Sequence, residues 1–181
     1  MLDACVLFPN VLRDSLLTLA EHELFRPLWS SAVLAEVRRN VLAKRPVDAS
    51  AFDRTLALMN RAFDGANVEG WESLVAGLEL PDRDDRHVLA AAIAGDAQSI
   101  VTFNLKDFPA HQLEPHHVDA THPDAFLLDL LDLTPGLTLV ALRKQAGRMR
   151  KPPMDLSGLI NRLERSGAPG FAEEVRRLTS I

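Results

Sequence analysis

The sequence predicts an α/β protein with a mostly parallel sheet flanked by helices, followed by a helical C-terminal extension. Up to Pro109, short apolar segments typical of buried strands alternate with amphipathic helical segments, which indicates parallel strands joined by helices. From Asp124 onward the patterns are helical. The 181 residues, 47% of them hydrophobic, suffice for one such domain and a modest appendage. We therefore expect a domain over residues 1–120 and an extension over residues 121–181.

The first part of the chain contains one apolar segment and several helical patterns. LDACVLFP is a short apolar stretch that Asp3 interrupts and Pro9 ends. A short extended piece is expected in LFRPLW. A first helix is expected over residues 11–19. A second begins at a cap formed by Ser30 or Ser31 and runs through Val41, and a third covers residues 49–63. A short strand is expected at Asn67–Glu69, inside the breaker segment GANVEGW.

The stretch from Asp85 to Pro109 predicts a helix, a buried strand and a turn. The helix runs from Asp85 to Ala94 with Gly95 as its stop, and its small alanines suit close packing against a sheet. QSIVTF is an apolar strand of the buried, parallel kind, and NLKDFP turns away from its end.

The chain changes character after Pro109. AHQLEPHHVDATHP is polar and proline-rich, which predicts a surface loop. About four short helices follow, and Pro123 and Pro135 occupy positions typical of a first helical turn.

Composition excludes several classes of protein. With 20 basic and 25 acidic residues the net charge is −5, which argues against a generally basic nucleic-acid binder. The chain has no tyrosine and only 6% aromatic residues, so a stacking platform for single strands is not expected. The single cysteine, Cys5, excludes an intramolecular disulfide and a cysteine-cluster zinc site. The sequence shows no leader pattern and no apolar run long enough for a bilayer, so we expect a cytoplasmic protein without a membrane partner.

A set of acidic and amide side chains lies where a parallel sheet would gather them. In open α/β sheets, ligands bind beyond the carboxyl ends of the strands. Asp3 ends the first apolar segment, Asn104 and Asp107 follow SIVTF, and Asp84 and Asp85 begin the helix before that strand. If the sheet is parallel, all of these residues can point into one crevice. Glu36 lies mid-helix beside the apolar positions Val33 and Val37, an unfavourable place unless it also faces this crevice. Such oxygen ligands suit one or two Mg²⁺ or Mn²⁺ ions, which would activate water for phosphodiester displacement.

Each of these residues also has a simpler explanation. Asp3 could be a solvated chain end, and Glu36 could pair with Arg39 or Asn40 on its own helix. Asp84 or Asp85 could be a helix cap, in which case capping by Asp84 leaves Asp85 facing inward. Asn104 and Asp107 could stabilise a turn. Thr102 either hydrogen-bonds a carboxylate or is an ordinary β-branched strand residue.

Histidines and basic residues supply weaker candidates. The spacing of His111, His116, His117 and His122 fits no standard zinc pattern, so a surface loop is favoured. His87, one turn into its helix, faces solvent or the crevice edge, where it could contact phosphate. A cluster that could be a solvated helix face or could steer RNA contains Arg143, Lys144, Arg148, Arg150 and Lys151. Arg38 and Arg39 are rival candidates because they lie beside Glu36.

Four motifs in order resemble those of a known family. LDACVLFP, AEVRRN, PDRDDRHVLAAA and VTFNLKDFP are similar to the four acidic motifs of the PIN-domain family, in the bacterial branch that includes VapC-type toxins. The resemblance covers Met1 to Pro109, and one subgroup carries a helical C-terminal extension. It implies a three-layer α/β/α fold, dependence on Mg²⁺ or Mn²⁺, and endoribonuclease activity. The family's first strand is usually longer, so either Cys5 to Phe8 complete it or the chain as written begins late.

The resemblance also implies roles for individual residues. Asp3, Glu36 and Asp85 match the three core acids. Asn104 matches the position after the last strand that holds Asp or Asn, and Asp107 matches the acid one turn further on. The implied catalytic residues are therefore Asp3, Glu36, Asp85 and Asp107, and the implied metal ligands are these four with Asn104. Asp84 is an additional candidate ligand.

Taken together, these observations predict a Mg²⁺-dependent ribonuclease, the toxin of a type II toxin–antitoxin system. The resemblance implies an RNA substrate, a small cognate antitoxin and a homodimer as partners. Two rivals remain: a PIN-fold binding or scaffold protein with weak or no catalysis, which the neutral Asn104 allows, and a metal-dependent phosphatase or DNA nuclease.

Overall fold

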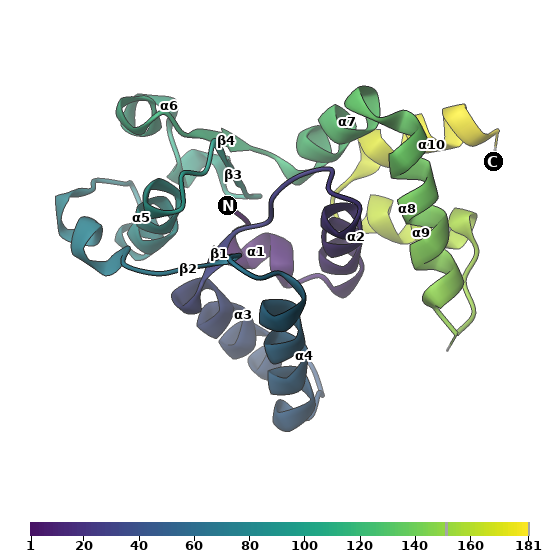
Figure 1. Ribbon diagram of the computed structural model, residues 1–181, viewed down its shortest axis with the longest axis horizontal. Helices are drawn as coiled ribbons and strands as arrows, with labels where there is room; N and C mark the ends of the chain where they lie inside the picture. Colours follow the sequence, from purple (N-terminus) through teal and green to yellow (C-terminus); the bar gives the residue numbers. More distant parts are fainter. Residues whose placement is uncertain (151, 181) are drawn as a thin grey trace. The chain divides into compact units, whose positions relative to one another are not determined.

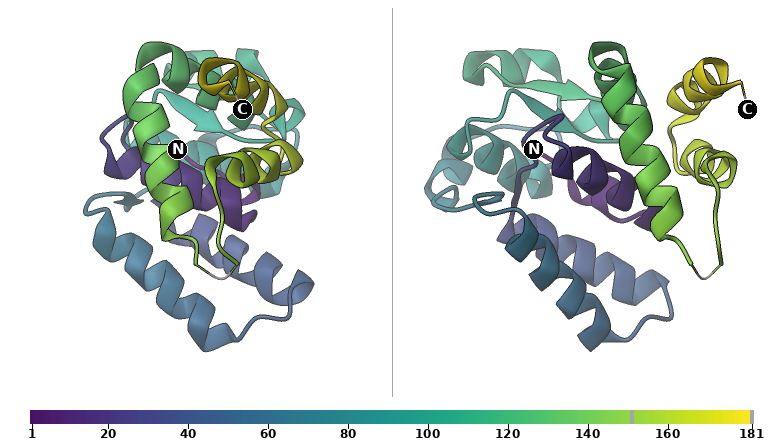
Figure 2. Two further views of the ribbon diagram at one scale, coloured as in Figure 1. Left: turned by 90° about the vertical axis from the view of Figure 1, so that its right-hand side faces the viewer. Right: turned by 45° about the vertical axis from the view of Figure 1, so that its right-hand side comes forward.

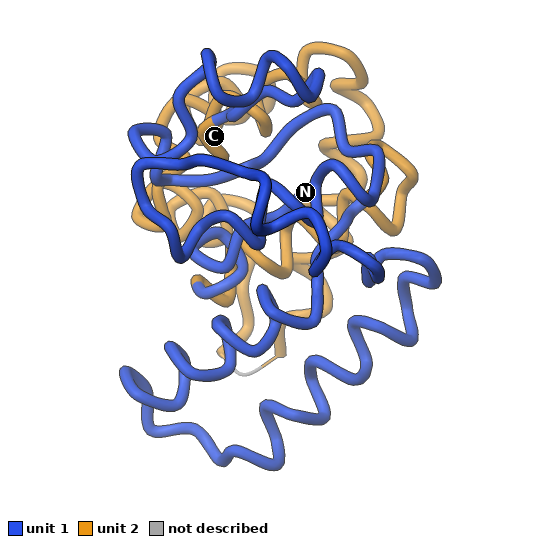
Figure 3. The backbone as a smooth tube through the Cα atoms, turned by 90° about the vertical axis from the view of Figure 1, so that its left-hand side faces the viewer, with its two compact units in different colours: residues 1–8, 27–121 blue, residues 9–26, 122–181 orange. Residues whose placement is uncertain are grey.

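The computed structural model describes residues 1–150 and 152–180, and the chain folds into two compact units. Met1–Phe8 and Pro27–Thr121 form the first unit, and Pro9–Arg26 joins the chain from His122 onward in the second. Figure 3 shows the two units in different colours. Our division at residue 120 did not anticipate that Pro9–Arg26 packs with the C-terminal helices, and as a division into domains it stays a prediction.

The first unit contains short parallel strands. Strand β1 (Trp29–Ser30) pairs in parallel with β2 (Asn67–Val68), and β3 (Ser99–Val101) pairs in parallel with β4 (Asp119–Thr121). The first residues of the chain lie between the two pairs, because Leu2 bridges Val101 in parallel and its N–H donates to the Leu28 carbonyl at 2.8 Å (Figure 1). The predicted α/β fold with parallel strands and a helical C-terminal region is confirmed, although each strand is only two or three residues long.

Of the two possibilities that the sequence left open, the one in which Cys5 to Phe8 complete the first strand is wrong. Ala4–Leu7 forms the short helix α1, because Oδ1 of Asp3 accepts the N–H of Ala4 at 2.6 Å and caps the helix. The extended segment that contains the Leu2 bridge therefore ends at Asp3, and Val6 and Leu7 are core residues on α1.

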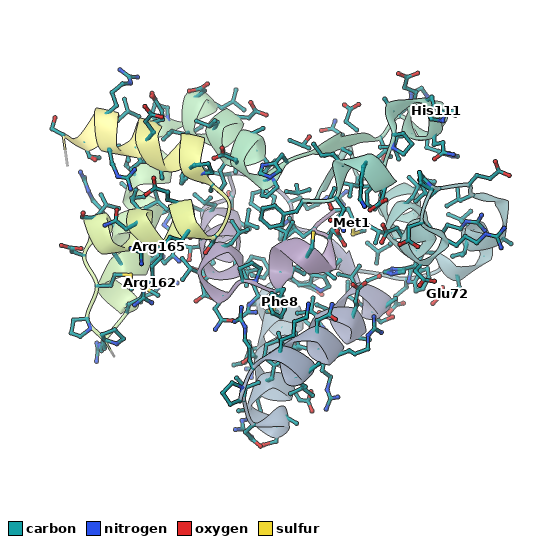
Figure 4. The ribbon with its side chains drawn as sticks, turned by 180° about the vertical axis from the view of Figure 1, so that it is seen from behind. Met1, Phe8, Glu72, His111, Arg162 and Arg165 are labelled. Carbon is teal, nitrogen blue, oxygen red and sulfur yellow. The ribbon has the colours of Figure 1, made fainter. Side chains whose placement is uncertain are left out.

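The helices of the first unit follow the sequence pattern closely. Ser30 caps α3 (Ser31–Lys44) by accepting the Val33 N–H at 3.2 Å, as predicted, and α3 buries its apolar stripe. Helix α4 (Ala49–Ala62) forms a hairpin with α3 (Figure 2). At the C-terminal end of α3 the Arg45 guanidinium lies 4.3 Å from the ring centre of Phe8, which Figure 4 labels. The shorter helical segments are η1 (Glu72–Gly77), η2 (Arg83–Asp85), η3 (Leu105–Asp107), α6 (Ala110–Leu113) and η4 (Glu114–His116).

The polar stretch after Pro109 is not the simple loop that we expected. It contains α6, η4 and β4, and the N–H of Asp119 bonds to the carbonyl of Gln98 at 2.9 Å. The sequence concealed β4 because Asp119–Thr121 is an edge strand with polar, largely uncovered positions.

Helix α5 (Arg86–Ala94) packs tightly against the strands at its C-terminal end. A Cβ atom on Gly95 would lie 2.7 Å from Cγ2 of Val68 and 3.2 Å from Cδ1 of Leu28. Gly95 therefore ends the helix as predicted, but its φ of −88° shows that close approach, and not a left-handed backbone, requires glycine here.

We expect Gly95→Ala to lower the free energy of unfolding by about 1–3 kcal/mol, because the added methyl overlaps a packed side chain. Gly77→Ala is the matched control, since a Cβ there meets no atom within 4 Å. Urea unfolding of the two variants and the wild type measures the effect. Equal stability of all three proteins would contradict the packing argument.

The second unit is helical. Its helices are α2 (Asn10–Glu21), α7 (Pro123–Leu133), α8 (Pro135–Arg148), α9 (Leu156–Arg165) and α10 (Pro169–Thr179). The prolines that begin α7 and α8 confirm the first-turn prediction. The buried hydroxyl of Ser15 donates to Oε1 of Gln145 at 2.8 Å and ties α2 to α8. Among the described residues no single helix is long and apolar enough to cross a membrane, and α7 and α8 reach that length only together, across a bend of 118°.

Candidate metal and nuclease site

Asp3 is a buried carboxylate and not a solvated chain end. Its side chain is almost fully covered, near the chain end that Figure 4 marks with Met1. Oδ2 accepts the hydroxyl of Thr102 at 2.7 Å and the thiol of Cys5 at 3.0 Å, while Oδ1 accepts the Ala4 N–H. Burial, followed by the charge of Asp3, raises the pKa of the Cys5 thiol to about 12, so the thiol stays protonated and donates. The hydrogen bond from the Thr102 hydroxyl to Asp3 confirms the interpretation in which Thr102 bonds to a carboxylate.

Thr102→Val is expected to lower the free energy of unfolding by about 1–3 kcal/mol, because it leaves a buried carboxylate oxygen of Asp3 without its closest donor. The substitution also removes the acceptor of the Asn104 N–H, which lies 3.0 Å from the Thr102 hydroxyl. Thr102→Ser keeps the hydroxyl and serves as the control. If thermal unfolding shows valine to be as well tolerated as serine, the hydroxyl does not hold Asp3.

Acidic and amide residues from three segments line one hollow of about 740 Å³. Glu36 reaches it from α3, and Asn104 follows β3. The segment that leads into α5 adds further walls, and the polar lining residues together are Glu36, Arg39, Asp82, Asp84, Asp85, His87 and Asn104.

Asp85 is the electrostatic centre of this cluster. Its half-buried side chain makes no capping hydrogen bond, although the residue stands where η2 meets α5. Burial and, after it, the negative charges of Asp3, Asp82, Asp107 and Glu36, in that order, together raise the pKa of Asp85 to about 7. A carboxyl group responds to four others in this way only when they lie close to it. The structure therefore brings together acidic residues that are far apart in the sequence, from Asp3 to Asp107.

The capping explanation of Asp84 and Asp85 is wrong. The cap of η2 is Asp82, whose Oδ1 accepts the N–H of Asp84 at 2.9 Å. Sequence reasoning missed Asp82, although an Asp directly before a helical segment is a recognisable cap signal. Because Asp82 supplies the cap, Asp85 is free to face the other acids.

Asn104 and Asp107 stand at the two ends of one tight turn. The carbonyl of Asn104 accepts the N–H of Asp107 at 2.9 Å, and the exposed Asn104 side chain lines the hollow without capping η3. Asp107 and Asp3 do not line the hollow, but their charges act on Asp85.

The donor set fits a hard divalent cation. It consists of carboxylates and one amide, all of which offer oxygen, the ligand atom that Mg²⁺ and Mn²⁺ prefer. In the described part of the chain, no three carboxylate, imidazole or thiol groups lie close enough together to hold a metal ion as they stand. Mg²⁺ commonly binds through one or two carboxylates and keeps several waters.

Glu36 has a partner that the sequence did not reveal. Nε2 of His87 lies 3.6 Å from its Oε2, whereas Asn40 on the same helix donates to Oε1 at a longer-than-usual 3.4 Å. The contact with His87, aided by Arg39 and Asn40, lowers the pKa of Glu36 despite its burial. The expectation that Glu36 merely pairs within its own helix is therefore incomplete.

The basic residues considered as contacts for RNA differ in whether they are paired with an acid or line the hollow. Arg38 is engaged in a two-pronged pair with Asp53, at 2.5 and 3.0 Å, whereas Arg39 lines the hollow. In the second unit Arg148 pairs with Glu21 at 2.8 Å, and Lys151 lies outside the described residues. His122 accepts the N–H of Asp124 at 3.2 Å as a helix cap.

Both parts of the chain are similar to known proteins. The profile described as "PIN domain" matches residues 1–106, and the profile described as "VapC50 C-terminal domain" matches residues 123–177. A protein of Mycobacterium tuberculosis named "Putative ribonuclease VapC50" is 40% identical over 109 residues, which are 60% of this chain and 63% of that protein. The chain thus spans less than two thirds of that relative's length. No solved structure matches the chain. Because the PIN domain profile matches residues 1–106, which is more than half of the chain, the chain belongs to the PIN domain family.

Proposed function

We propose that this protein is a metal-dependent endoribonuclease that hydrolyses phosphodiester bonds in RNA. The observation that carries the proposal is the hollow that Glu36, Asp84, Asp85 and Asn104 line together, where the charges of Asp3 and Asp107 also act on Asp85. Membership of the PIN family and the ribonuclease name of the M. tuberculosis relative support the same reaction. A catalytically inactive scaffold would have no use for a half-buried acid held at such an electrostatic cost.

Mg²⁺ or Mn²⁺ would be held by Glu36, Asp85 and Asn104, with Asp3 and Asp107 close by and Asp84 as an additional ligand. When bound, such an ion supplies positive charge that polarises the phosphate and makes water more acidic.

The chain's own residues bind and orient the substrate and the acids. Thr102 and Cys5 fix the carboxylate of Asp3, and His87 with Asn40 contacts both oxygens of Glu36. Arg39, at the wall of the hollow, offers a guanidinium group to an RNA phosphate. In the hydrolysis, the oxygen of water forms a bond to phosphorus and the bond from phosphorus to the 3′ oxygen breaks. That oxygen takes up a proton, which leaves 3′-hydroxyl and 5′-phosphate ends.

We further propose that the protein is the toxin of a type II toxin–antitoxin pair in the cytoplasm, and that it forms homodimers. Its regulator would be a small antitoxin that inserts a cationic side chain such as arginine into the acidic hollow. The excess of carboxylates among the residues that line the hollow supports this complementarity.

The test is cleavage by the purified protein of end-labelled RNA, single-stranded DNA and a nitrophenyl phosphate, each with Mg²⁺, with Mn²⁺ and with a chelator. We expect RNA cleavage that requires a metal and yields 5′-phosphate ends. Cleavage of DNA or of the nitrophenyl ester in preference to RNA would replace the proposal by a DNA nuclease or phosphatase. Failure to cleave any substrate, together with no growth arrest on expression, would favour the scaffold.

A further inference from the structure

His87 occupies a defined position behind Glu36. It projects from α5, lines the hollow and is largely covered, with 19% of its side chain exposed. Its Nε2 faces Oε2 of Glu36 on α3, and its ring lies 6.1 Å from that of Trp71 at an angle of 56°. The imidazole is therefore held between an aromatic ring and a carboxylate.

The surroundings of the ring decide which nitrogen carries hydrogen in the neutral imidazole. Nδ1 is buried and has no hydrogen-bond partner among the described residues. A hydrogen on Nδ1 would bury an unpaired donor and would direct the lone pair of Nε2 at a carboxylate. A hydrogen on Nε2 points at Glu36 and leaves only a bare acceptor buried. The second arrangement is lower in energy.

We propose that His87 is a positioning residue, which uses its Nε2–H to hold the carboxylate of Glu36 toward Asp85 and the hollow. This inference rests on the proposed function, because it concerns a side chain that would bind the metal. Asn40 donates to Oε1 and His87 faces Oε2, so one partner from α3 and one from α5 restrict the two oxygens. Without His87, only the long contact with Asn40 would restrain Glu36.

Three variants distinguish positioning from packing. His87→Phe keeps a ring against Trp71 and removes the donor. His87→Gln places an amide N–H near the position of Nε2, and His87→Asn places one near the position of Nδ1. If His87 acts only by packing, phenylalanine is the best replacement. If His87 positions Glu36, glutamine is the best replacement.

The measurement is the dissociation constant of Mn²⁺, from the EPR signal of free Mn²⁺, for the full chain and the three variants. We expect His87→Phe and His87→Asn to weaken Mn²⁺ binding by about tenfold and His87→Gln to stay near the wild type, as for other side chains that orient a metal ligand. Phenylalanine equal to the wild type, or glutamine no better than phenylalanine, would overturn the inference.

A second measurement in the metal-free protein separates this inference from the proposed function. ¹⁵N NMR of His87 is expected to show hydrogen on Nε2, and hydrogen on Nδ1 would overturn the positioning role. A double-mutant cycle of Glu36→Gln and His87→Phe on the free energy of unfolding is expected to be non-additive, and strict additivity would equally count against the contact. If the wild type neither binds Mn²⁺ nor cleaves RNA, the proposed function fails, while these two measurements still decide the contact.

Discussion

Asp85→Asn is expected to reduce metal-dependent RNA cleavage by about a thousandfold, because it removes the charge at the centre of the acid cluster while keeping the shape of the side chain. Glu36→Gln is expected to act in the same direction. Asp84→Asn is expected to have a smaller effect, since Asp84 lines the hollow but is not among the charges with the largest effect on the pKa of Asp85. The measurement is the rate of cleavage of a labelled RNA at saturating Mg²⁺.

The matched control is Glu114→Gln, which also removes one negative charge. Glu114 is exposed, does not line the hollow and does not act on Asp85. Its activity should equal that of the wild type. Full activity of Asp85→Asn in the same assay would contradict the proposal that the acid cluster is catalytic. Circular dichroism of each variant excludes unfolding as the cause of inactivity.

The second large effect is on stability in the absence of metal. Asp85 has a pKa of about 7 in the folded chain and 3.8 as a model group, so the folded state holds the proton more tightly. The stability that this group contributes is fully present below pH 3.8 and is lost as the pH rises through 7. We therefore expect Asp85→Asn to be more stable than the metal-free wild type at pH 8.5 by about 2 kcal/mol, a figure reduced for solvent screening of a half-exposed group.

Urea unfolding in the presence of a chelator at pH 5.5, 7 and 8.5 measures this difference. The advantage of Asp85→Asn should shrink as the pH falls, because the wild-type carboxyl becomes protonated and neutral. Added Mg²⁺ at pH 8.5 should stabilise the wild type more than the variant, since a cation relieves the same repulsion. A constant difference between the two proteins at every pH would show that Asp85 titrates normally.

The acids Asp3 and Glu36, whose charges act on Asp85, have contacts of their own that restrict them. Asp3 is fixed by a hydroxyl, a thiol and a backbone N–H, and Glu36 by His87 and Asn40. These contacts hold like charges near one another in the absence of a cation. The tightly packed Gly95 anchors the opposite end of α5, the helix that follows Asp85.

Some features of the fold could not be predicted, because they depend on contacts between distant residues. Asp3 caps α1, so the apolar residues that follow it form a short buried helix and not a strand. Periodicity does not distinguish the two over so few residues. The pairing of β4 with β3, and of α2 with α8, likewise joins segments whose own sequences carry no sign of the partner.

The sequence by itself determined which elements form and which side chains can offer oxygen to a cation, because helical periodicity, caps and residue chemistry are local properties. The helices α3, α4 and α5 and the residues Asp3, Glu36, Asp85 and Asn104 follow from those rules. Only the tertiary structure decided that Asp82 caps while Asp85 faces inward, that His87 meets Glu36, and that four acids raise one pKa. Those outcomes depend on distances of a few ångströms between residues far apart in the chain, and electrostatic energy varies steeply over such distances.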